Sequence, residues 1–200
     1  MKLLAIVGSY RKGKTIDTLV DSAIEGARAN SADVDATKIH LVDKNIEYCR
    51  NCMVCREDDP DKPLAKCVIA DDMQTLCTAL DEADAFIFGT PVNMGHATAI
   101  MKTFLERLCW VLAKPGRFPL KGCPQPRTNR RKKAIIIVSS GIIPPLLRKW
   151  CDEATPLLRE TCKTNLNARV VGSLYAGAVE RKGVDAYLKK AFDLGKKLTS

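Results

Sequence analysis

The chain lacks the features of a membrane-inserted or exported protein. None of its apolar runs approaches the roughly 18 residues of a bilayer-spanning helix. Its first residues carry neither the apolar core nor the small-residue cleavage site of a signal peptide. Internal repeats and low-complexity segments are missing as well. We therefore expect a single soluble, cytoplasmic domain over residues 1–200, with no membrane partner.

Aromatic residues are also few, at 6% of the chain, although the formal charge is +9. Much of the positive charge lies in residues 117–133 and in the last expected helix, and these segments hold few aromatic side chains that could stack on bases. We therefore expect no nucleic-acid partner. A basic face of this kind typically aids solubility or attracts anionic ligands.

The first apolar segment leads into a candidate phosphate-binding loop. Leu3–Val7 predicts a buried parallel strand, and apolar residues recur at helical spacing after Thr15. The turn between them therefore opens a helix whose first N–H groups are free to bind an anion. Gly8, Gly13, Lys14 and Thr15 also match the nucleoside-triphosphate pattern G-x-x-x-x-G-K-[ST]. A loop that holds the single phosphate of FMN fits the same residues, so the loop alone leaves both ligands open.

Short apolar segments alternate with helical patterns along the chain, which predicts an open parallel sheet with helices on both faces. The expected strands are Leu3–Val7, Asp35–Val42, Ala85–Thr90, Ala134–Val138 and Arg169–Tyr175. The expected helices are 16–30, Met73–Glu82, Ala97–Leu112, one within Pro144–Thr164, and Val184–Leu198. Pro91–His96 is expected to be a loop. Ligands of such sheets bind at the carboxyl ends of the strands.

Two segments interrupt this alternation. Residues 43–73 hold no convincing helix or strand and contain a cluster of cysteines, and a structureless insert of this length is usually functional. Residues 113–131 are rich in proline, lysine and arginine and are expected to form a basic surface connection.

The strand ends argue against hydrolysis of a nucleoside triphosphate. A P-loop enzyme needs an acidic residue at the end of a second strand to hold magnesium. The expected strand ends Gly89-Thr90-Pro91 and Ser139-Ser140-Gly141 contain no Asp or Glu. ATP or GTP hydrolysis is therefore the least favoured function, and a flavin ring is compatible with these small residues.

Four of the nine cysteines form the motif C-x2-C-x2-C-x11-C, made of Cys49, Cys52, Cys55 and Cys67. Outside an oxidising compartment, such clustering indicates metal or redox chemistry rather than a disulfide framework. C-x2-C-x2-C begins many [4Fe–4S] sites, which makes such a cluster the favoured ligand. A four-thiolate zinc site and free thiols are the alternatives.

At these residues the sequence resembles the NADPH-dependent FMN reductase and iron–sulfur flavoprotein families. The resemblance rests on Gly8–Gly13, on Cys49–Cys67 followed by Asp71–Met73, on Gly89–Gly95 and on Thr98–Arg107. These segments lie in the family order across most of the chain. The resemblance implies a flavodoxin-like three-layer α/β sandwich with a five-stranded parallel sheet in the order 2-1-3-4-5.

The resemblance also implies the cofactor-binding residues. Ser9, Arg11, Lys12, Gly13 and Thr15 would surround the FMN phosphate, with Lys14 peripheral. Pro91, Val92, Asn93, Met94 and Gly95 would run along the isoalloxazine edge, and Ser139, Ser140 and Gly141 would close the other side. Iron–sulfur flavoproteins carry a compact cysteine motif in the same part of the chain.

The expected function is therefore that of an FMN-dependent NAD(P)H oxidoreductase. The flavin would accept a hydride from NAD(P)H, or electrons from a protein donor, and pass them to a small-molecule or protein acceptor. Since the flavin carries the chemistry, no side chain is expected to be catalytic. A non-enzymatic flavodoxin-like electron carrier is the alternative. By resemblance we expect a homodimer or homotetramer.

Overall fold

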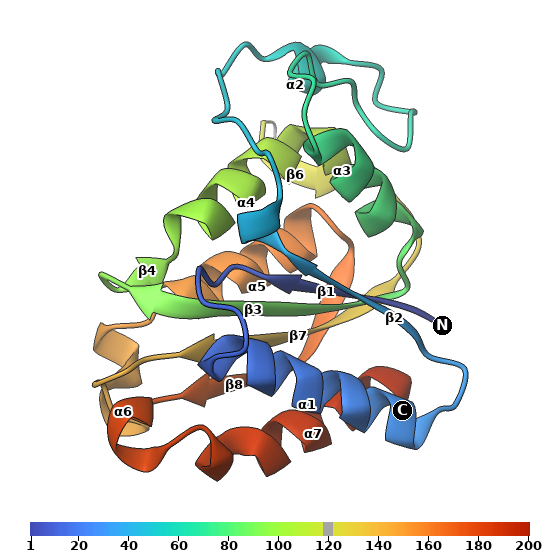
Figure 1. The fold of residues 1–200 in the computed structure, drawn as a ribbon. Coiled ribbons are helices and arrows are strands. Elements are labelled where there is room, and N and C mark those ends of the chain that lie inside the picture. Colours follow the sequence, from blue (N-terminus) through green and yellow to red (C-terminus); the bar gives the residue numbers. More distant parts are fainter. Residues whose placement is uncertain (118–121) are drawn as a thin grey trace.

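A computed structural model describes residues 1–117 and 122–200. Its central sheet has five parallel strands in the order β2-β1-β3-β7-β8, which confirms the predicted order (Figure 1). The strands are β1 (Lys2–Val7), β2 (Asp35–His40), β3 (Ala85–Asn93), β7 (Lys132–Ser139) and β8 (Ala168–Ala176).

Helices cover both faces of this sheet and make the expected three layers. One face packs against α1 (Thr15–Asn30) and α7 (Asp185–Thr199). The other packs against α3 (Met73–Glu82), α4 (Ala99–Leu112) and α5 (Ala154–Thr164). Successive residues of β1 alternate between these two cores, because side chains of a strand point to opposite faces. The strands are apolar on both sides for this reason.

Helices α1 and α7 touch through their backbones. A Cβ atom on Gly26 would lie 1.9 Å from the carbonyl oxygen of Phe192, and one on Gly195 would lie 1.8 Å from that of Ala23. Only glycine permits this approach. The contact fixes the helix layer beneath the first loop.

The prediction of a plain loop over Pro91–His96 is wrong. β3 continues to Asn93 and turns back antiparallel into β4 (His96–Ala97), with Asn93 opposite His96. α4 consequently begins at Ala99, not at Ala97, because Thr98 is its N-cap and accepts a hydrogen bond from the N–H of Met101. β2 is also shorter than predicted, since Leu41–Asp43 forms a 3-10 turn.

The connection over residues 113–131 contains secondary structure that the sequence did not reveal. β5 (Ala113–Pro115) pairs antiparallel with β6 (Pro124–Pro126). Residues 118–121 of this predicted connection lie outside the described residues. The insert at 43–73 is irregular apart from the single turn α2 (Val54–Glu57), and it lies above α3 and α4 in Figure 1.

Two short helices complete the described chain. They are the 3-10 helix η2 (Pro145–Trp150) and α6 (Val179–Lys182), both in the segments that follow the carboxyl ends of β7 and β8. Within residues 1–117 and 122–200, no helix has the length and apolar character needed to cross a bilayer.

Candidate functional site

Three loops that the sequence predicts to bind FMN lie at one edge of the sheet. The N–H of Gly8, which follows β1, donates a 2.7 Å hydrogen bond to the carbonyl of Gly89 in β3. In the next pair of strands, Pro91 lies opposite Ser139. The loops after β1, β3 and β7 are therefore neighbours at the carboxyl ends of the strands, where ligands of open α/β sheets bind.

The first loop presents positive charge at an uncapped helix end. Lys14 is the N-cap residue of α1, has extended backbone angles, and makes no capping hydrogen bond with its side chain. The hydroxyl of Ser9 is buried and accepts a 3.2 Å hydrogen bond from the N–H of Arg11. Arg11 and Lys12 are exposed, and the ammonium of Lys12 lies 2.5 Å from a carboxylate oxygen of Asp43. The free first-turn N–H groups and these cations suit a phosphate.

A buried carboxylate beneath this loop was missed by the sequence analysis. Asp17 accepts a 2.6 Å hydrogen bond from the N–H of Gly13, which has a positive φ of 64°. Its other carboxylate oxygen lies 2.8 Å from Lys38 Nζ and 2.8 Å from His40 Nε2. Burial raises the pKa of Asp17, but these hydrogen bonds outweigh it and lower that pKa to about 2. Lys38 and His40 are two residues apart in β2, so their side chains point to the same face of the sheet. This spacing is the sequence signal that could have indicated a common acidic partner.

The first loop is also tied to the start of α4. The buried hydroxyl of Thr98 donates a 2.6 Å hydrogen bond to the carbonyl of Gly8. The phenol oxygen of Tyr10 accepts a 3.2 Å hydrogen bond from the N–H of Ile100. These contacts couple the first loop to the segment that follows the β3–β4 hairpin.

The tip of that hairpin has the geometry of a type I′ turn. Met94 and Gly95 have φ values of 50° and 82°, and positive φ at both central residues defines this turn. The side chain of Met94 is 98% exposed. The carbonyl of Gly95 accepts a 2.8 Å hydrogen bond from the N–H of Glu153. An exposed thioether is thus held at the rim in a conformation that is unfavourable for methionine.

The third loop is closely packed. Ser139 and Ser140 are buried, and the hydroxyl of Ser140 accepts a 3.2 Å hydrogen bond from the N–H of Ile143. A Cβ atom on Gly141 would lie 2.4 Å from a carboxylate oxygen of Glu180 in α6. Gly141 therefore has no room for a side chain unless Glu180 moves.

The four cysteines of the motif lie on the insert at 43–73 in two environments. Cys49 and Cys52 are exposed, whereas Cys55 and Cys67 are half-buried. Burial raises the pKa of the Cys55 thiol, and negative charge on Cys67, Cys49 and Cys52 raises it further. In residues 1–117 and 122–200, however, no three Cys, His, Asp or Glu side chains are grouped closely enough to hold a metal ion.

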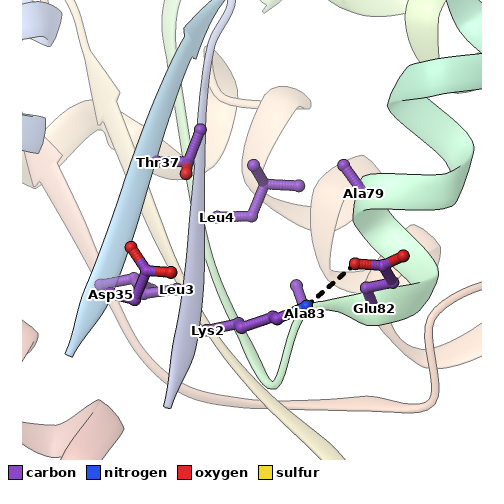
Figure 2. A pocket seen from close by; sticks show the side chains of 8 residues that line it. All are labelled: Lys2, Leu3, Leu4, Asp35, Thr37, Ala79, Glu82 and Ala83. Atoms are coloured by element: carbon purple, nitrogen blue, oxygen red, sulfur yellow. Dashed lines mark hydrogen bonds and ion pairs between the residues drawn. The ribbon is translucent and has the colours of Figure 1, made fainter. Parts of the chain in front are cut away.

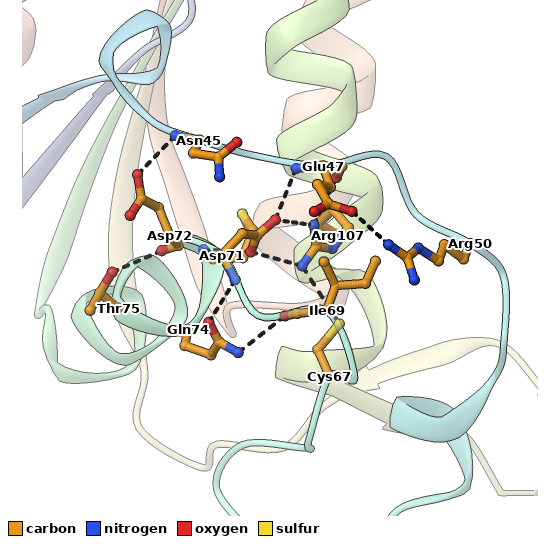
Figure 3. A network of polar contacts seen from close by, with 11 residues as sticks. Asn45, Glu47, Arg50, Cys67, Ile69, Asp71, Asp72, Gln74, Thr75 and Arg107 are labelled. Atoms are coloured by element: carbon orange, nitrogen blue, oxygen red, sulfur yellow. Dashed lines mark hydrogen bonds and ion pairs between the residues drawn. The ribbon is translucent and has the colours of Figure 1, made fainter.

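Arg107 of α4 binds both ends of this insert (Figure 3). Its guanidinium forms a bidentate ion pair with the carboxylate of Asp71, at 2.5 and 3.0 Å. It also donates a 2.7 Å hydrogen bond to the carbonyl of Glu47 and lies 3.6 Å from Sγ of Cys67. Among the described residues, its Nε is a buried nitrogen without a hydrogen-bond partner.

Asp71 and Asp72, which precede α3, both bind the start of the insert. The carboxylate of Asp71 accepts hydrogen bonds from the N–H groups of Met73 and Glu47 as well as from Arg107. Asp72 occupies the N-cap position, yet its carboxylate accepts a 2.8 Å hydrogen bond from the N–H of Asn45. Both acids therefore fasten the insert to α3.

Arg127, which follows β6, binds the middle of the insert. Its guanidinium donates hydrogen bonds to the carbonyls of Asp59 at 2.6 Å and of Cys55 at 3.3 Å, and to that of Ala113 at 3.0 Å. Burial lowers the pKa of this guanidinium. The four thiols of the insert are of the type that ligates iron–sulfur clusters and zinc, but the described residues do not bring three of them together.

Among the cavities of the described residues, two that lie away from the carboxyl edge of the sheet border β1 or the insert. One of about 200 Å³ lies at the amino ends of β1 and β2, between Lys2, Asp35 and Glu82, as Figure 2 shows. A second, of about 330 Å³, lies under the insert and is lined by Cys67, Met73, Cys77 and Val111 among others. Burial raises the pKa of the Cys77 thiol to about 12, so this sulfur is a buried apolar group at neutral pH.

The sheet order and the three loops at its carboxyl edge define a flavodoxin-like α/β protein. The chain belongs to the NADPH-dependent FMN reductase family, whose family model matches residues 1–180. The chain is 30% identical to an iron-sulfur flavoprotein of Archaeoglobus fulgidus, over 99% of this chain and 79% of that protein. It is 31% identical to an iron-sulfur flavoprotein of Methanosarcina thermophila, over 60% of this chain but only 58% of that protein.

Solved structures support the fold at low sequence identity. An azoreductase from Bacillus anthracis superposes with a TM-score of 0.74 at 14% identity, covering 98% of this chain and 99% of that one. An NAD(P)H:quinone oxidoreductase from Methanothermobacter marburgensis superposes with a TM-score of 0.69 at 14% identity, covering 98% of both chains. An FMN-dependent NADH-azoreductase of B. anthracis in complex with FMN gives 0.72 at 11% identity, covering 100% of this chain and 99% of that one.

Proposed function

We propose that residues 1–200 form one domain that acts as an FMN-dependent NAD(P)H oxidoreductase. The observation that carries this proposal is the meeting of three loops at the carboxyl edge of the sheet, with the basic loop at the start of α1. Membership of the FMN reductase family and the FMN in a structural neighbour support it.

The first loop would hold the FMN phosphate. Its first-turn N–H groups, the hydroxyls of Ser9 and Thr15 and the cations of Arg11 and Lys12 can donate hydrogen bonds to phosphate oxygens. The N–H of Gly13 is already bound to Asp17, so we assign Gly13 the task of shaping the loop. Lys14 is exposed at the N-cap and remains peripheral.

The hairpin and the third loop would hold the flavin ring. Pro91, Val92, Asn93, Met94 and Gly95 would line one side, and Ser139, Ser140 and Gly141 the other. When bound, FMN supplies the hydride-accepting ring, and the chain's task is to orient it. Exposed apolar side chains near this rim offer contact to a planar donor or acceptor: Met94, Ile142, Leu146 and Trp150.

NAD(P)H is the proposed electron donor, and a small molecule or a protein is the proposed acceptor. The structural neighbours are named as azoreductases and as an NAD(P)H:quinone oxidoreductase, which favours aromatic acceptors. We also propose that the chain works as a homodimer or homotetramer, because its exposed apolar side chains lie beside the flavin rim.

We further propose that Cys49, Cys52, Cys55 and Cys67 ligate a [4Fe–4S] cluster, with zinc as the alternative. The motif spacing and the names of the relatives support this proposal. Ligation would require the exposed segment around Cys49 and Cys52 to close onto the two half-buried cysteines.

Three measurements on the anaerobically purified protein test the proposed oxidoreductase and the proposed metal centre. They are an absorption spectrum, an analysis of iron, zinc and sulfide, and steady-state oxidation of NADPH and NADH. We expect bound FMN and turnover with a quinone or azo acceptor. Bound FMN without turnover on either nucleotide would overturn the reductase and leave an electron carrier. A chain without FMN would overturn the proposed site.

A further inference from the structure

A basic cavity lies at the amino edge of the sheet, opposite the edge where the three candidate flavin loops meet. Its volume is about 340 Å³, and it lies where β7 and β8 begin, beside the last turn of α5. β7 has 8 residues, so a rise of about 3.3 Å per residue places the cavity roughly 23 Å from those loops. The cavity is therefore separate from the candidate flavin site.

Four cations line this cavity, and no acidic residue of the described chain does. They are Arg131, which precedes β7, Lys132 in β7, Lys163 in the last turn of α5 and Arg169 in β8. Arg131, Lys163 and Arg169 are exposed. Within residues 1–117 and 122–200 none of these three has an ion-pair partner, whereas the neighbouring Arg130 is paired with Asp84.

Lys132 is the buried member of the group, and its charge is already bound within the fold. Its Nζ donates hydrogen bonds of 2.8 and 2.7 Å to the carbonyls of Leu80 and Asp81 in α3. A cation near the C-terminal end of a helix is stabilised by the helix dipole. The three exposed cations are therefore the ones that a ligand can use.

Strand pairing brings two further positive charges together. Lys133 of β7 lies directly opposite Arg169 of β8 in the register of the sheet. Like charges opposite each other on adjacent strands repel and destabilise the pairing. The ammonium of Lys133 binds the carbonyl of Ser200. An anion in the cavity beside Arg169 would offset the remaining repulsion.

Asn167 holds the rim of the cavity in a fixed shape. Its φ is 50°, a left-handed conformation that asparagine adopts more readily than most residues. Its side-chain amide donates hydrogen bonds to the carbonyls of Thr128 at 3.4 Å and of Arg130 at 3.2 Å. Its own carbonyl accepts a 3.1 Å hydrogen bond from the N–H of Lys132. These bonds fasten the segment that carries Arg131 to the start of β8.

We propose that this cavity binds a small anion with two linked phosphate groups, inorganic pyrophosphate or the diphosphate of a nucleotide, through Arg131, Lys163 and Arg169. A guanidinium matches two phosphate oxygens at once, and an ammonium adds a point charge. Three cations without partners suit a ligand that carries several negative charges. The described lining residues include no aromatic side chain that could stack on a base, which disfavours a nucleic acid.

The test measures binding of inorganic pyrophosphate by isothermal titration calorimetry at about 150 mM salt, with excess FMN present to fill the first loop. Arg131→Gln/Lys163→Gln removes two charges from two sides of the cavity. Arg181→Gln/Lys189→Gln is the matched control, because it removes an exposed arginine and an exposed lysine from α6 and α7. Inorganic phosphate, ADP and a single-stranded oligonucleotide are the comparison ligands.

We expect the wild type to bind pyrophosphate more tightly than phosphate, and Arg131→Gln/Lys163→Gln to bind pyrophosphate at least about tenfold more weakly. The control variant should match the wild type. Tighter binding of ADP than of pyrophosphate would identify a nucleotide as the ligand, and the reverse order would identify the inorganic anion.

Arg169→Gln gives a second measurement that a merely structural role would not produce. It should weaken pyrophosphate binding, yet raise the unfolding temperature of the ligand-free protein by about 1 to 2 °C, because the repulsion with Lys133 is removed. A purely structural arginine would lower the unfolding temperature when it is replaced. If Arg131→Gln/Lys163→Gln fails to fold, Arg169→Gln alone decides.

Equal pyrophosphate affinity in Arg131→Gln/Lys163→Gln and in the control variant would overturn the proposal, as would a wild type that does not bind pyrophosphate at this salt concentration. Pyrophosphate binding that disappears when FMN is added would also overturn it, by placing the anion in the first loop. Tighter binding of the oligonucleotide than of pyrophosphate, lost in the same variant, would assign the cavity to nucleic acid instead. The inference does not rest on the proposed flavin function, since a protein without FMN would still allow the same comparison of variants.

Discussion

The backbone N–H of Gly13 donates a 2.6 Å hydrogen bond to the carboxylate of Asp17, which is buried directly beneath the loop that we propose binds the FMN phosphate. Lys38 and His40 approach the same carboxylate from β2. A negative charge at this place would repel a phosphate if it were not compensated. With these partners, it instead holds Gly13 in its positive-φ conformation and fixes the shape of the loop.

Asp17→Asn should destabilise the protein by about 2 kcal/mol at pH 7. The folded-state pKa of Asp17 is lowered from 3.8 to about 2, so the carboxylate contributes its full stability above about pH 5 and loses it as the pH falls toward 2. The difference in unfolding free energy between wild type and variant should therefore shrink toward zero near pH 2. Denaturant titrations at several pH values measure it.

Asp21→Asn is the matched control for this pH dependence. Asp21 also pairs with Lys38, but its side chain is 51% exposed, so its pair is screened by solvent. We expect less than about 1 kcal/mol of destabilisation for this variant. A difference between wild type and Asp17→Asn that does not change from pH 7 to pH 3 would contradict the role of the carboxylate.

Substitutions in the first loop should show which of its cations contacts the FMN phosphate and which is only peripheral. Arg11→Ala should weaken FMN binding at least about tenfold, as expected for the loss of a charge-assisted hydrogen bond. Lys14→Ala removes the same charge from the N-cap position and should have a smaller effect. Fluorescence titration of the flavin-free proteins with FMN measures both. A larger loss for Lys14→Ala than for Arg11→Ala would favour a triphosphate-type loop.

Gly26→Ala in α1 should destabilise the protein by about 3 kcal/mol, although alanine favours helices. The new methyl group would meet the carbonyl of Phe192 in α7, which is backbone and cannot move without separating the helices. Glu25→Ala, on the exposed side of α1, should be nearly neutral. Thermal unfolding compares the two. A stabilised Gly26→Ala would show that α1 and α7 pack further apart.

The layers of the fold could be predicted because each strand is a short apolar run and each long helix has an apolar face. β1, α1 and α3 lie within a residue or two of their predicted bounds. The hairpin at Asn93–His96 was not predicted, since its turn is Met94-Gly95 and lacks the Asn-Gly or Asp-Gly signal. The β5–β6 pair was hidden by its prolines, which normally indicate a loop.

The sequence predicted which loops would meet, because the carboxyl ends of parallel strands share an edge. It did not predict Asp17 under the first loop, nor the binding of the cysteine insert by Arg107 and Arg127. These contacts join residues between 4 and 72 positions apart. Most of them form only after the sheet has brought the elements together, so local patterns could not reveal them.

Substitutions at the hairpin tip should change stability in opposite directions. Met94→Asn places a residue that tolerates positive φ where methionine does not, and should stabilise the protein by about 0.5 kcal/mol. Gly95→Ala adds a Cβ at a φ of 82° and should cost about 1 kcal/mol, even though no atom lies near that position. Chemical denaturation compares both with wild type. An equal stability in all three proteins would contradict the type I′ turn.

The ion pair of Arg107 and Asp71 should be the strongest polar link between the insert and α4. Both side chains are almost fully buried. Burial raises the pKa of the Asp71 carboxyl, but the hydrogen bonds from Arg107 and from backbone N–H groups outweigh this and lower that pKa. Arg107→Met would leave that carboxylate buried without its cation and should cost about 3 to 5 kcal/mol. Asp71→Asn alone should also be strongly destabilising, because the guanidinium then loses its counter-charge.

A double-mutant cycle distinguishes this link from two independent effects. In the combined variant neither charge remains buried and unpaired. Its loss of unfolding free energy should therefore be smaller than the sum of the two single losses, by a coupling energy of about 2 kcal/mol. The exposed pair of Arg130 and Asp84 supplies the control, since its side chains are 55% and 42% exposed and should couple by less than about 1 kcal/mol. Additive losses for Arg107 and Asp71 would mean that the pair does not hold the insert. Limited proteolysis of residues 43–73 would then be no faster in Arg107→Met than in the wild type.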